Sequence, residues 1–273
     1  MTVRLHFPVS AHIRTAHSLL EAGRPGLVDV PIRYGIIEHP DHGPVLIDTG
    51  YTSALWTTKG WSLACYRRLM SPRLEEKLTP TAALARLGYT PADVKHVIVT
   101  HLHADHICGL GAFAHATFHL SRATAQAWQS PRKWGDVTEG VFPALLPPLM
   151  QWRAMEDARR VPLQFLDASE TGYSLFDDDS VVLVDLDGHL GGHIGVVVRT
   201  ATGPVLYAVD ASWTRHGYRE GCLPPAPLKW IISSPAQVLA ACAKVNRAEA
   251  LGWPVVLCHD PQPTPWDLTE ARR

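Results

Sequence analysis

The chain has 273 residues, 46% of them hydrophobic, and its 25 basic and 26 acidic side chains leave a formal net charge of −1. This composition excludes an intrinsically disordered chain, and without a long run of Lys or Arg it argues against a nucleic-acid or membrane-surface partner. A chain of this length buries roughly three-quarters of its unfolded surface, so its core needs no disulfides. Histidine is unusually frequent, at 15 residues.

The cysteines are odd in number and scattered, and none forms a C-x-x-C pair: Cys65, Cys108, Cys222, Cys242 and Cys258. This usage is typical of a reducing compartment. Residues 1–8 lack the apolar segment of a signal peptide, and the longest nearly apolar stretch, 141–150, is far shorter than the ~20 residues of a membrane span. We therefore expect a cytoplasmic protein that acts on a small molecule, with no membrane or nucleic-acid partner, and that could form a homodimer.

In chain order, the first predicted elements form a hairpin. Residues 28–37 are rich in β-branched side chains, and a second run at 45–47 follows a turn that contains Pro, Asp and Gly. The second run leads into Asp48-Thr49-Gly50, a polar tripeptide of the kind that forms functional loops at strand ends. A helix is predicted over 79–87, ended by Gly88, and a strand over 94–100.

The second half of the chain predicts further strands at 116–120, 163–166, 181–185, 195–199, 205–209 and 255–257, and a helix over about 235–250. Strands mixed with long helices predict an α/β fold, and the hairpin spacings favour mixed sheets. No fixed repeat or low-complexity linker divides the chain, so we expect a single domain, 1–273. Two aromatic- and proline-rich segments, near 52–76 and 128–160, are expected to be lid-like insertions, or else insertions packed down by their aromatic side chains.

The segment His101-Leu102-His103-Ala104-Asp105-His106 directly follows a predicted strand and holds three imidazoles and a carboxylate. These are ligands for zinc, iron or manganese. One ion cannot comfortably use all four side chains of so short a segment, so we expect them to be divided between two ions about 3.5–4 Å apart. Three more candidates lie at strand ends or in a glycine-rich loop, where α/β folds place their sites: His189, Asp210 and His259.

These motifs resemble those of the metallo-β-lactamase-superfamily hydrolases, and within that superfamily they are most similar to the N-acyl homoserine lactone lactonases. The resemblance extends over residues 28–260 and is carried by Val30-Pro31, 45–50, 100–106, Gly188-His189, 210–212 and His259-Asp260. It implies a four-layer αβ/βα sandwich with two mixed sheets and a metal site at the sheet edges. It also implies hydrolysis of a lactone ester of the acyl-homoserine-lactone type.

The resemblance further implies a role for each candidate ligand. The first ion would be held by His101, His103 and His189, the second by Asp105, His106 and His259, and Asp210 would bridge the two. The expected ions are zinc, with iron or manganese as alternatives. A hydroxide between the ions would attack the lactone carbonyl, and Asp105 would orient it and pass a proton to the leaving oxygen.

Three residues are expected around these ligands. Asp48 and His193 would hold ligand groups in place by hydrogen bonds from behind. Trp213 is a candidate substrate contact, although it could instead belong to the core. These lactonases commonly have Tyr where Trp213 stands and an aromatic residue where Ala104 stands, and Trp retains a donor but has no phenolic hydroxyl.

Two other hydrolytic functions remain open. A thioester could replace the lactone, as in glyoxalase-II-like enzymes, or a phosphodiester could be the substrate. A pocket gated by Trp56, Trp61 and Trp134 would favour an apolar acyl chain, whereas Arg215 and Arg219 could clamp a phosphate.

An oxidoreductase, the iron-dependent persulfide dioxygenase, uses a His/His/His/Asp subset around one iron. The additional His259 favours two ions over one. Nine other histidines are scattered, and nothing in their spacing predicts a second site.

Overall fold

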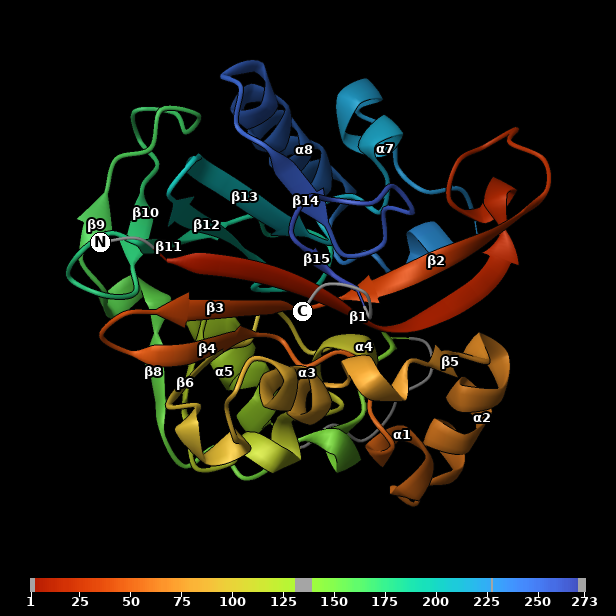
Figure 1. Ribbon diagram of the computed structural model, residues 1–273. Coiled ribbons are helices and arrows are strands. Elements are labelled where there is room, and N and C mark those ends of the chain that lie inside the picture. Colours follow the sequence, from red (N-terminus) through yellow and green to blue (C-terminus); the bar gives the residue numbers. More distant parts are fainter. Residues whose placement is uncertain (1–2, 131–138, 227, 270–273) are drawn as a thin grey trace.

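The structure is a computed structural model that describes residues 3–130, 139–226 and 228–269 (Figure 1). The first sheet has the order β15-β1-β3-β4-β6-β7-β8, with β2 and β5 also paired to β1. Its strands are β1 (Arg4–Ala16), β2 (Leu27–Arg33), β3 (Gly35–His39), β4 (Gly43–Ile47), β5 (Arg73–Leu74), β6 (His96–Ile98), β7 (Thr117–Leu120), β8 (Trp152–Ala154) and β15 (Asp267–Leu268). Strands β4, β6, β7 and β8 run parallel, whereas β1, β3 and β4 are antiparallel neighbours.

The second sheet has the order β14-β13-β12-β11-β10-β9 and is antiparallel except for the β13–β14 pair. Its strands are β9 (Arg160–Val161), β10 (Gly172–Ser174), β11 (Val181–Asp185), β12 (Ile194–Thr200), β13 (Gly203–Val209) and β14 (Val255–Leu257). Both sheets are therefore mixed, as the sequence predicted.

Helices cover the outer face of each sheet. In Figure 1, α7 (Arg215–Glu220) and α8 (Pro235–Ala250) lie outside the second sheet. On the far side of the first sheet lie α1 (Ala54–Thr57), α2 (Trp61–Met70), α3 (Pro80–Arg86), α4 (Ala104–Ile107) and α5 (Arg122–Gln129). Short 3-10 helices occur at His17–Leu19, Glu76–Leu78, Pro91–Asp93, Leu110–Phe113, Pro143–Leu145, Met155–Asp157 and Leu228–Ile231. The helix, sheet, sheet, helix order is the predicted four-layer sandwich.

The nearly continuous apolar runs of β12 and β13 follow from burial on both faces. Alternate side chains of a strand point to opposite faces. Val196, Val198 and Tyr207 belong to the core between the sheets, whereas Val197 and Leu206 belong to the core beneath α8. A strand buried on both sides has no polar face to alternate with the apolar one.

Several predicted elements are confirmed, and two need correction. The hairpin is β3–β4, and the helix over 235–250 is α8. The run 28–37 is not one strand, because it divides at Tyr34 into β2 and β3, which both pair with β1. The strand predicted at 163–166 is wrong. Leu166 N–H donates to Leu163 O in a turn, and the buried Leu163 and Phe165 join the core beneath α8 without strand pairing.

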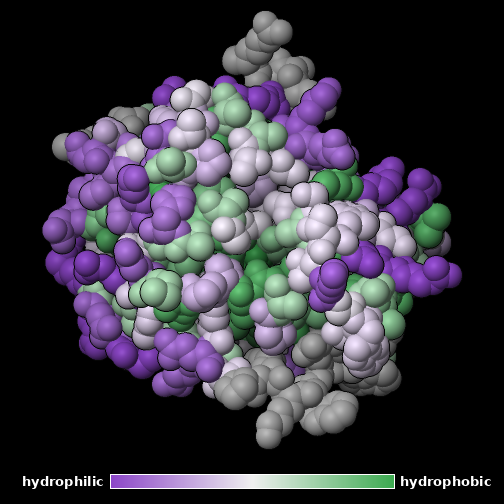
Figure 2. All heavy atoms as spheres, turned by 90° about the horizontal axis from the view of Figure 1, so that it is seen from below, coloured by the Kyte–Doolittle hydropathy of each residue, from purple (hydrophilic) through white to green (hydrophobic). Residues whose placement is uncertain are grey.

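The segment 52–76 contains α1, α2 and β5. Leu55, Leu63 and Tyr66 are buried, while Trp61 is 77% exposed. Of the segment 128–160, residues 131–138 lie outside the described part. Seen from below the view of Figure 1, hydrophobic residues gather in the middle of the molecule and hydrophilic ones line much of the rim (Figure 2). No helix in the described residues has the length and apolar content needed to span a bilayer.

Candidate metal centre

The predicted ligands come together where strands of both sheets end. Residues 99–103 connect β6 to α4, which carries Asp105 and His106, and His189 lies in the turn between β11 and β12. Asp210 follows β13 directly, and His259 follows β14 by one residue. Loops at the carboxyl ends of parallel strands are the usual place for a site in α/β folds.

Two backbone conformations beside the cluster are rare for their residue types. Val209 has φ +54° and Asp48 has φ +60°, both in the left-handed region that residues with a Cβ seldom adopt. The β-branched Val209 makes this conformation especially costly, so the surrounding structure must hold it. The bend at Val209 ends the β13 strand immediately before Asp210.

The first donor group consists of His101, His103, His189 and Asp210, all buried. His103 Nδ1 lies 3.0 Å from His101 Nε2 and 3.0 Å from His189 Nε2. A tetrahedral zinc ion with Zn–N bonds of about 2.0–2.1 Å places its nitrogens only slightly farther apart. Asp210 Oδ2 lies 3.7 Å from His101 Nε2 and 3.3 Å from His189 Nε2, so it completes the group.

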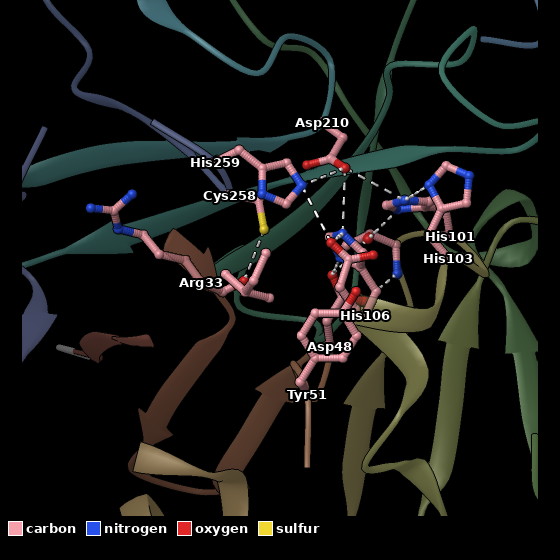
Figure 3. Close-up of polar contacts among 12 residues, drawn as sticks. Arg33, Asp48, Tyr51, His101, His103, His106, Asp210, Cys258 and His259 are labelled. Carbon is pink, nitrogen blue, oxygen red and sulfur yellow. Dashed lines mark hydrogen bonds and ion pairs between the residues drawn. The ribbon is translucent and has the colours of Figure 1, made fainter. Parts of the chain in front are cut away.

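The second donor group consists of Asp105, His106, Cys258 and His259, again all buried. Asp105 Oδ2 lies 3.5 Å from His106 Nε2 and 3.3 Å from His259 Nε2. Asp210 also faces this group, because its Oδ2 lies 3.4 Å from His106 Nε2 and 3.2 Å from His259 Nε2. The same carboxylate oxygen therefore lies between both groups, as Figure 3 shows.

Unsatisfied polar atoms show that these groups suit an ion. Within the described residues, His106 Nε2 and Asp210 Oδ1 are buried and have no hydrogen-bond partner. Leaving a buried polar atom unpaired is costly unless another partner binds it. Imidazole and carboxylate donors on two adjoining sets fit two divalent ions.

Asp48 lies behind His106. Its Oδ2 accepts from His106 Nδ1 at 2.8 Å and from the Thr100 hydroxyl at 2.7 Å, and its Oδ1 accepts from Thr100 N–H at 2.8 Å. Burial raises the pKa of Asp48, while the facing His106 opposes that rise. Asp48 thus fixes the His106 ring with Nε2 turned toward the donors (Figure 3).

His193 has both ring nitrogens engaged by the backbone. Nδ1 donates to Leu186 O at 2.8 Å, and Nε2 accepts from Asp210 N–H at 3.3 Å. His193 therefore contacts the backbone of Asp210 and offers no nitrogen to an ion. His259 has a comparable anchor, because its Nδ1 donates to Pro31 O at 3.1 Å.

Electrostatics distinguish the two groups. Burial lowers the pKa of His101, and burial followed by the nearby His189 lowers the pKa of His103 to about 3, so both rings are neutral with lone pairs to offer. In the second group burial would lower the pKa of His106, but Asp105 and other carboxylates raise it overall. Burial would likewise raise the pKa of Asp105, yet His106 and His259 hold it below its ordinary value. The carboxylates therefore attract positive charge to this place.

Trp213 lies at the edge of both groups. Its ring makes edge-on contacts with the His189 ring, at 5.8 Å between centroids, and with the His259 ring, at 6.4 Å. It also lines a small pocket that includes His189 and Asp210. The rest of this pocket's lining is largely apolar or small: Leu20, Ala211, Ser212, Thr214, Gly217, Cys222, Pro224, Ile232 and Val238.

Other residues suggested by the sequence lie elsewhere. Trp56 and Trp61 are exposed and are absent from the described lining of this pocket, and Trp134 falls outside the described residues. Arg215 Nε donates to Asp260 Oδ2 at 3.0 Å, and Arg219 forms an ion pair with Glu249. Neither arginine lines the pocket as a phosphate clamp would.

Sequence analysis did not identify Cys258 or Thr100 as members of the site. Each directly neighbours a predicted ligand, but strand patterning alone does not tell which side chain of such a pair turns inward. Sequence analysis also did not identify a second cluster of four histidines near Phe176: His39, His42, His96 and His119. They come from different strands and loops, so their spacing along the chain carried no signal.

Comparisons with known proteins agree with this architecture. Residues 28–271 match the Metallo-beta-lactamase superfamily. The chain is 28% identical over 270 residues to the N-acyl homoserine lactonase AttM of Azorhizobium caulinodans, covering 96% of this chain and 95% of that protein. It is 29% identical over 224 residues to an N-acyl homoserine lactonase of Bacillus sp, covering 80% of each.

A solved structure of an N-acyl homoserine lactone hydrolase, with the product N-hexanoyl-L-homoserine bound at its catalytic metal center, has the same fold. The TM-score is 0.72 at 23% identity, over 95% of this chain and 94% of the other. The family match spans most of the sequence and includes every predicted ligand, which confirms the resemblance seen in the motifs. The chain belongs to the metallo-beta-lactamase superfamily.

Proposed function

We propose that this protein is a metal-dependent hydrolase that opens the lactone ester of N-acyl homoserine lactones. The observation that carries the proposal is the pair of buried donor groups that share Asp210, next to a pocket with a largely apolar lining. Both curated relatives described above are named N-acyl homoserine lactonases.

In this proposal the first ion is held by His101, His103 and His189, the second by Asp105, His106 and His259, and Asp210 binds both. The proposed ions are zinc, because imidazole-rich sets suit zinc, with iron and manganese as alternatives. When bound, such ions lower the pKa of water toward neutrality and polarise an ester carbonyl.

The residues of the chain would contribute position and proton transfer. Asp105, held ionised by His106 and His259, can accept a proton from the attacking water and deliver it to the leaving alkoxide. Asp48 and His193 keep His106 and the Asp210 backbone in place. Trp213 can donate its indole N–H to the substrate and cover the lactone with its ring.

The lining of the pocket favours binding of an acyl chain over binding of a phosphate group. Leu20, Pro224 and Ile232 line it, and no Lys or Arg appears among its described lining residues. A phosphodiester needs cationic or similar donors around its oxygens. Thioester hydrolysis is the second candidate, because the same apolar lining would accept a thioester of an acyl group.

The test is a substrate panel on protein whose metal content is measured by plasma spectrometry. We expect about two ions per chain and turnover of acyl-homoserine lactones of several chain lengths, well above turnover of thioesters, phosphodiesters and a glutathione persulfide. Hydrolysis of the thioester alone would overturn the lactone assignment. Oxygen consumption with the persulfide, at one iron per chain, would establish the oxidoreductase alternative.

We further propose that residues 1–273 form one domain, since the core between the sheets includes residues from both. Leu55, Leu63 and Tyr66 anchor the 52–76 insertion, which leaves its exposed tryptophans as the part that could close as a lid. A cytoplasmic location is proposed from the unpaired state of all five cysteines. The homodimer remains a prediction that sedimentation equilibrium can check.

A further inference from the structure

Cys258 lies in the second donor group, although no role follows for it from the proposed function. It is the first residue after β14 and is 0% exposed. Its sulfur and the donor atoms of Asp105, His106 and His259 all lie within 4.8 Å of one another. Figure 3 shows the sulfur below the His259 ring, with its hydrogen bond directed to the Arg33 carbonyl.

We propose that the Cys258 sulfur is a ligand of the second metal ion, together with Asp105, His106 and His259. This inference rests on the proposed two-ion site. On binding, the S–H bond breaks, the proton leaves to the buffer, and a sulfur electron pair forms the bond to the ion. The second ion would then be held by one thiolate, two imidazoles and the carboxylates of Asp105 and Asp210.

The hydrogen-bond partner of the Cys258 thiol stays satisfied if the sulfur binds an ion. The thiol donates to Arg33 O at 3.2 Å. That same carbonyl accepts from the Tyr207 hydroxyl at 2.9 Å, so it keeps a donor when the thiol proton leaves. No buried carbonyl is left unpaired by the change.

The backbone holds Cys258 in place independently of its side chain. Its N–H donates to Val209 O at 3.0 Å, and its carbonyl accepts from Arg33 N–H at 3.3 Å. These main-chain hydrogen bonds fix the position of the Cys258 Cα beside the donors.

A second observation points to a ligand at this place. His106 Nε2 is fully buried and faces the same group, and it has no hydrogen-bond partner among the described residues. Its other nitrogen is fixed by Asp48. The unpaired nitrogen and the buried sulfur thus belong to one cluster of donor atoms.

A thiolate changes which ions the second group selects. Soft sulfur ligands favour zinc and related soft ions, whereas manganese and magnesium prefer oxygen donors. With a thiolate in the set, the second group should discriminate strongly for cadmium or zinc over manganese.

The experiment loads chelator-treated full-length protein with two equivalents of Co²⁺ and records its near-ultraviolet spectrum. We expect a sulfur-to-cobalt charge-transfer band in the wild type that Cys258→Ser and Cys258→Ala both lack. Cys242→Ser is the matched control, because Cys242 is also buried and donates to a backbone carbonyl, Ala211 O. Cys222→Ser checks the cysteine that lines the neighbouring pocket, and both control variants should retain the band.

A competition between Cd²⁺ and Mn²⁺, read by metal content, gives a second measure. We expect Cys258→Ser to lower the preference for Cd²⁺ at least tenfold, and Cys242→Ser to leave it unchanged. A wild-type protein that takes up two cobalt ions without the band would overturn the thiolate ligand and leave the proposed function standing. Failure to take up cobalt would overturn both. The wild-type spectrum decides the matter even if a Cys258 variant does not fold.

Discussion

His106 donates its Nδ1 proton to Oδ2 of Asp48 across 2.8 Å, and the opposite nitrogen of the ring faces the second donor group. Both side chains are 0% exposed. A carboxylate behind an imidazole sets the tautomer and orientation of the ring and increases its basicity as a ligand. Asp48 thereby controls a donor that it does not adjoin in sequence.

Asp48→Asn should weaken binding of the second ion by about 10–100-fold, because an amide binds the His106 proton less strongly and can force the other tautomer. Titration of the metal-free protein with zinc against a chromogenic chelator measures the change. The exposed Asp41→Asn serves as control and should bind as the wild type does. Equal affinities in Asp48→Asn and the wild type would show that the ring needs no support from behind.

Asp210→Ala should abolish loading of two ions and turnover together, because one oxygen of Asp210 faces both groups. Plasma spectrometry and a lactonase assay on the same preparation check this. The exposed Asp177→Ala is the matched control. Two ions per chain with normal activity in Asp210→Ala would refute the bridging role.

Trp213→Phe keeps an aromatic ring, although a smaller one, and removes the indole N–H. If that group donates to the substrate, kcat/KM for the lactone should fall roughly fivefold, the cost of one ordinary hydrogen bond. Metal content should not change. Trp253→Phe, in which the ring packs on Phe165 away from the site, is the control. An unaltered kcat/KM in Trp213→Phe would restrict Trp213 to packing.

The free energy of unfolding should depend on pH through His119, a member of the second histidine cluster. Burial, followed by the nearby His96, lowers the pKa of His119 to about 3 in the folded chain, whereas an unfolded histidine titrates near about 6.5. The folded state then binds fewer protons over this window, so the free energy of unfolding falls as the pH drops from about 6.5 toward about 3. The slope for one group is at most about 1.4 kcal/mol per pH unit.

Urea unfolding of metal-free protein between about pH 6.5 and about pH 4.5, inside this window, measures the slope. His119→Gln should reduce it, because the variant has no imidazole to protonate there. His115→Gln, at an exposed position, should leave it as in the wild type. Parallel slopes in all three proteins would assign the acid sensitivity to other groups.

Much of the fold was predictable because burial leaves a pattern in the sequence. The runs that became β11, β12 and β13 are apolar over most of their length, since both of their faces are covered there. Residues 163–166 carry the same kind of pattern but form a turn, because apolar side chains can reach a core without strand pairing. Strand β1 escaped prediction, as Pro8 and Ser10 interrupt its apolar pattern and its pairing changes partner along its length.

The residues of the candidate site likewise include some that the sequence predicted and some that it did not. The short segment 101–106 concentrates donors, so the sequence located it directly. The inward turn of Cys258 and the meeting of His96 with His119 depend on packing between segments distant in the chain. No local spacing records such contacts, and only the folded arrangement reveals them.

Each donor group takes residues from both sheets. In the first donor group, His103 comes after β6 of the first sheet and His189 lies between two strands of the second sheet. In the second donor group, Asp105 likewise comes after β6 and His259 comes after β14 of the second sheet. Bound ions would therefore tie the two halves of the molecule together, much as cross-links do. Removal of the ions should first weaken the contact between the two sheets around the donor groups. Amide protons at the carboxyl ends of β6 and β13 should then exchange faster, while those beneath α8 stay protected.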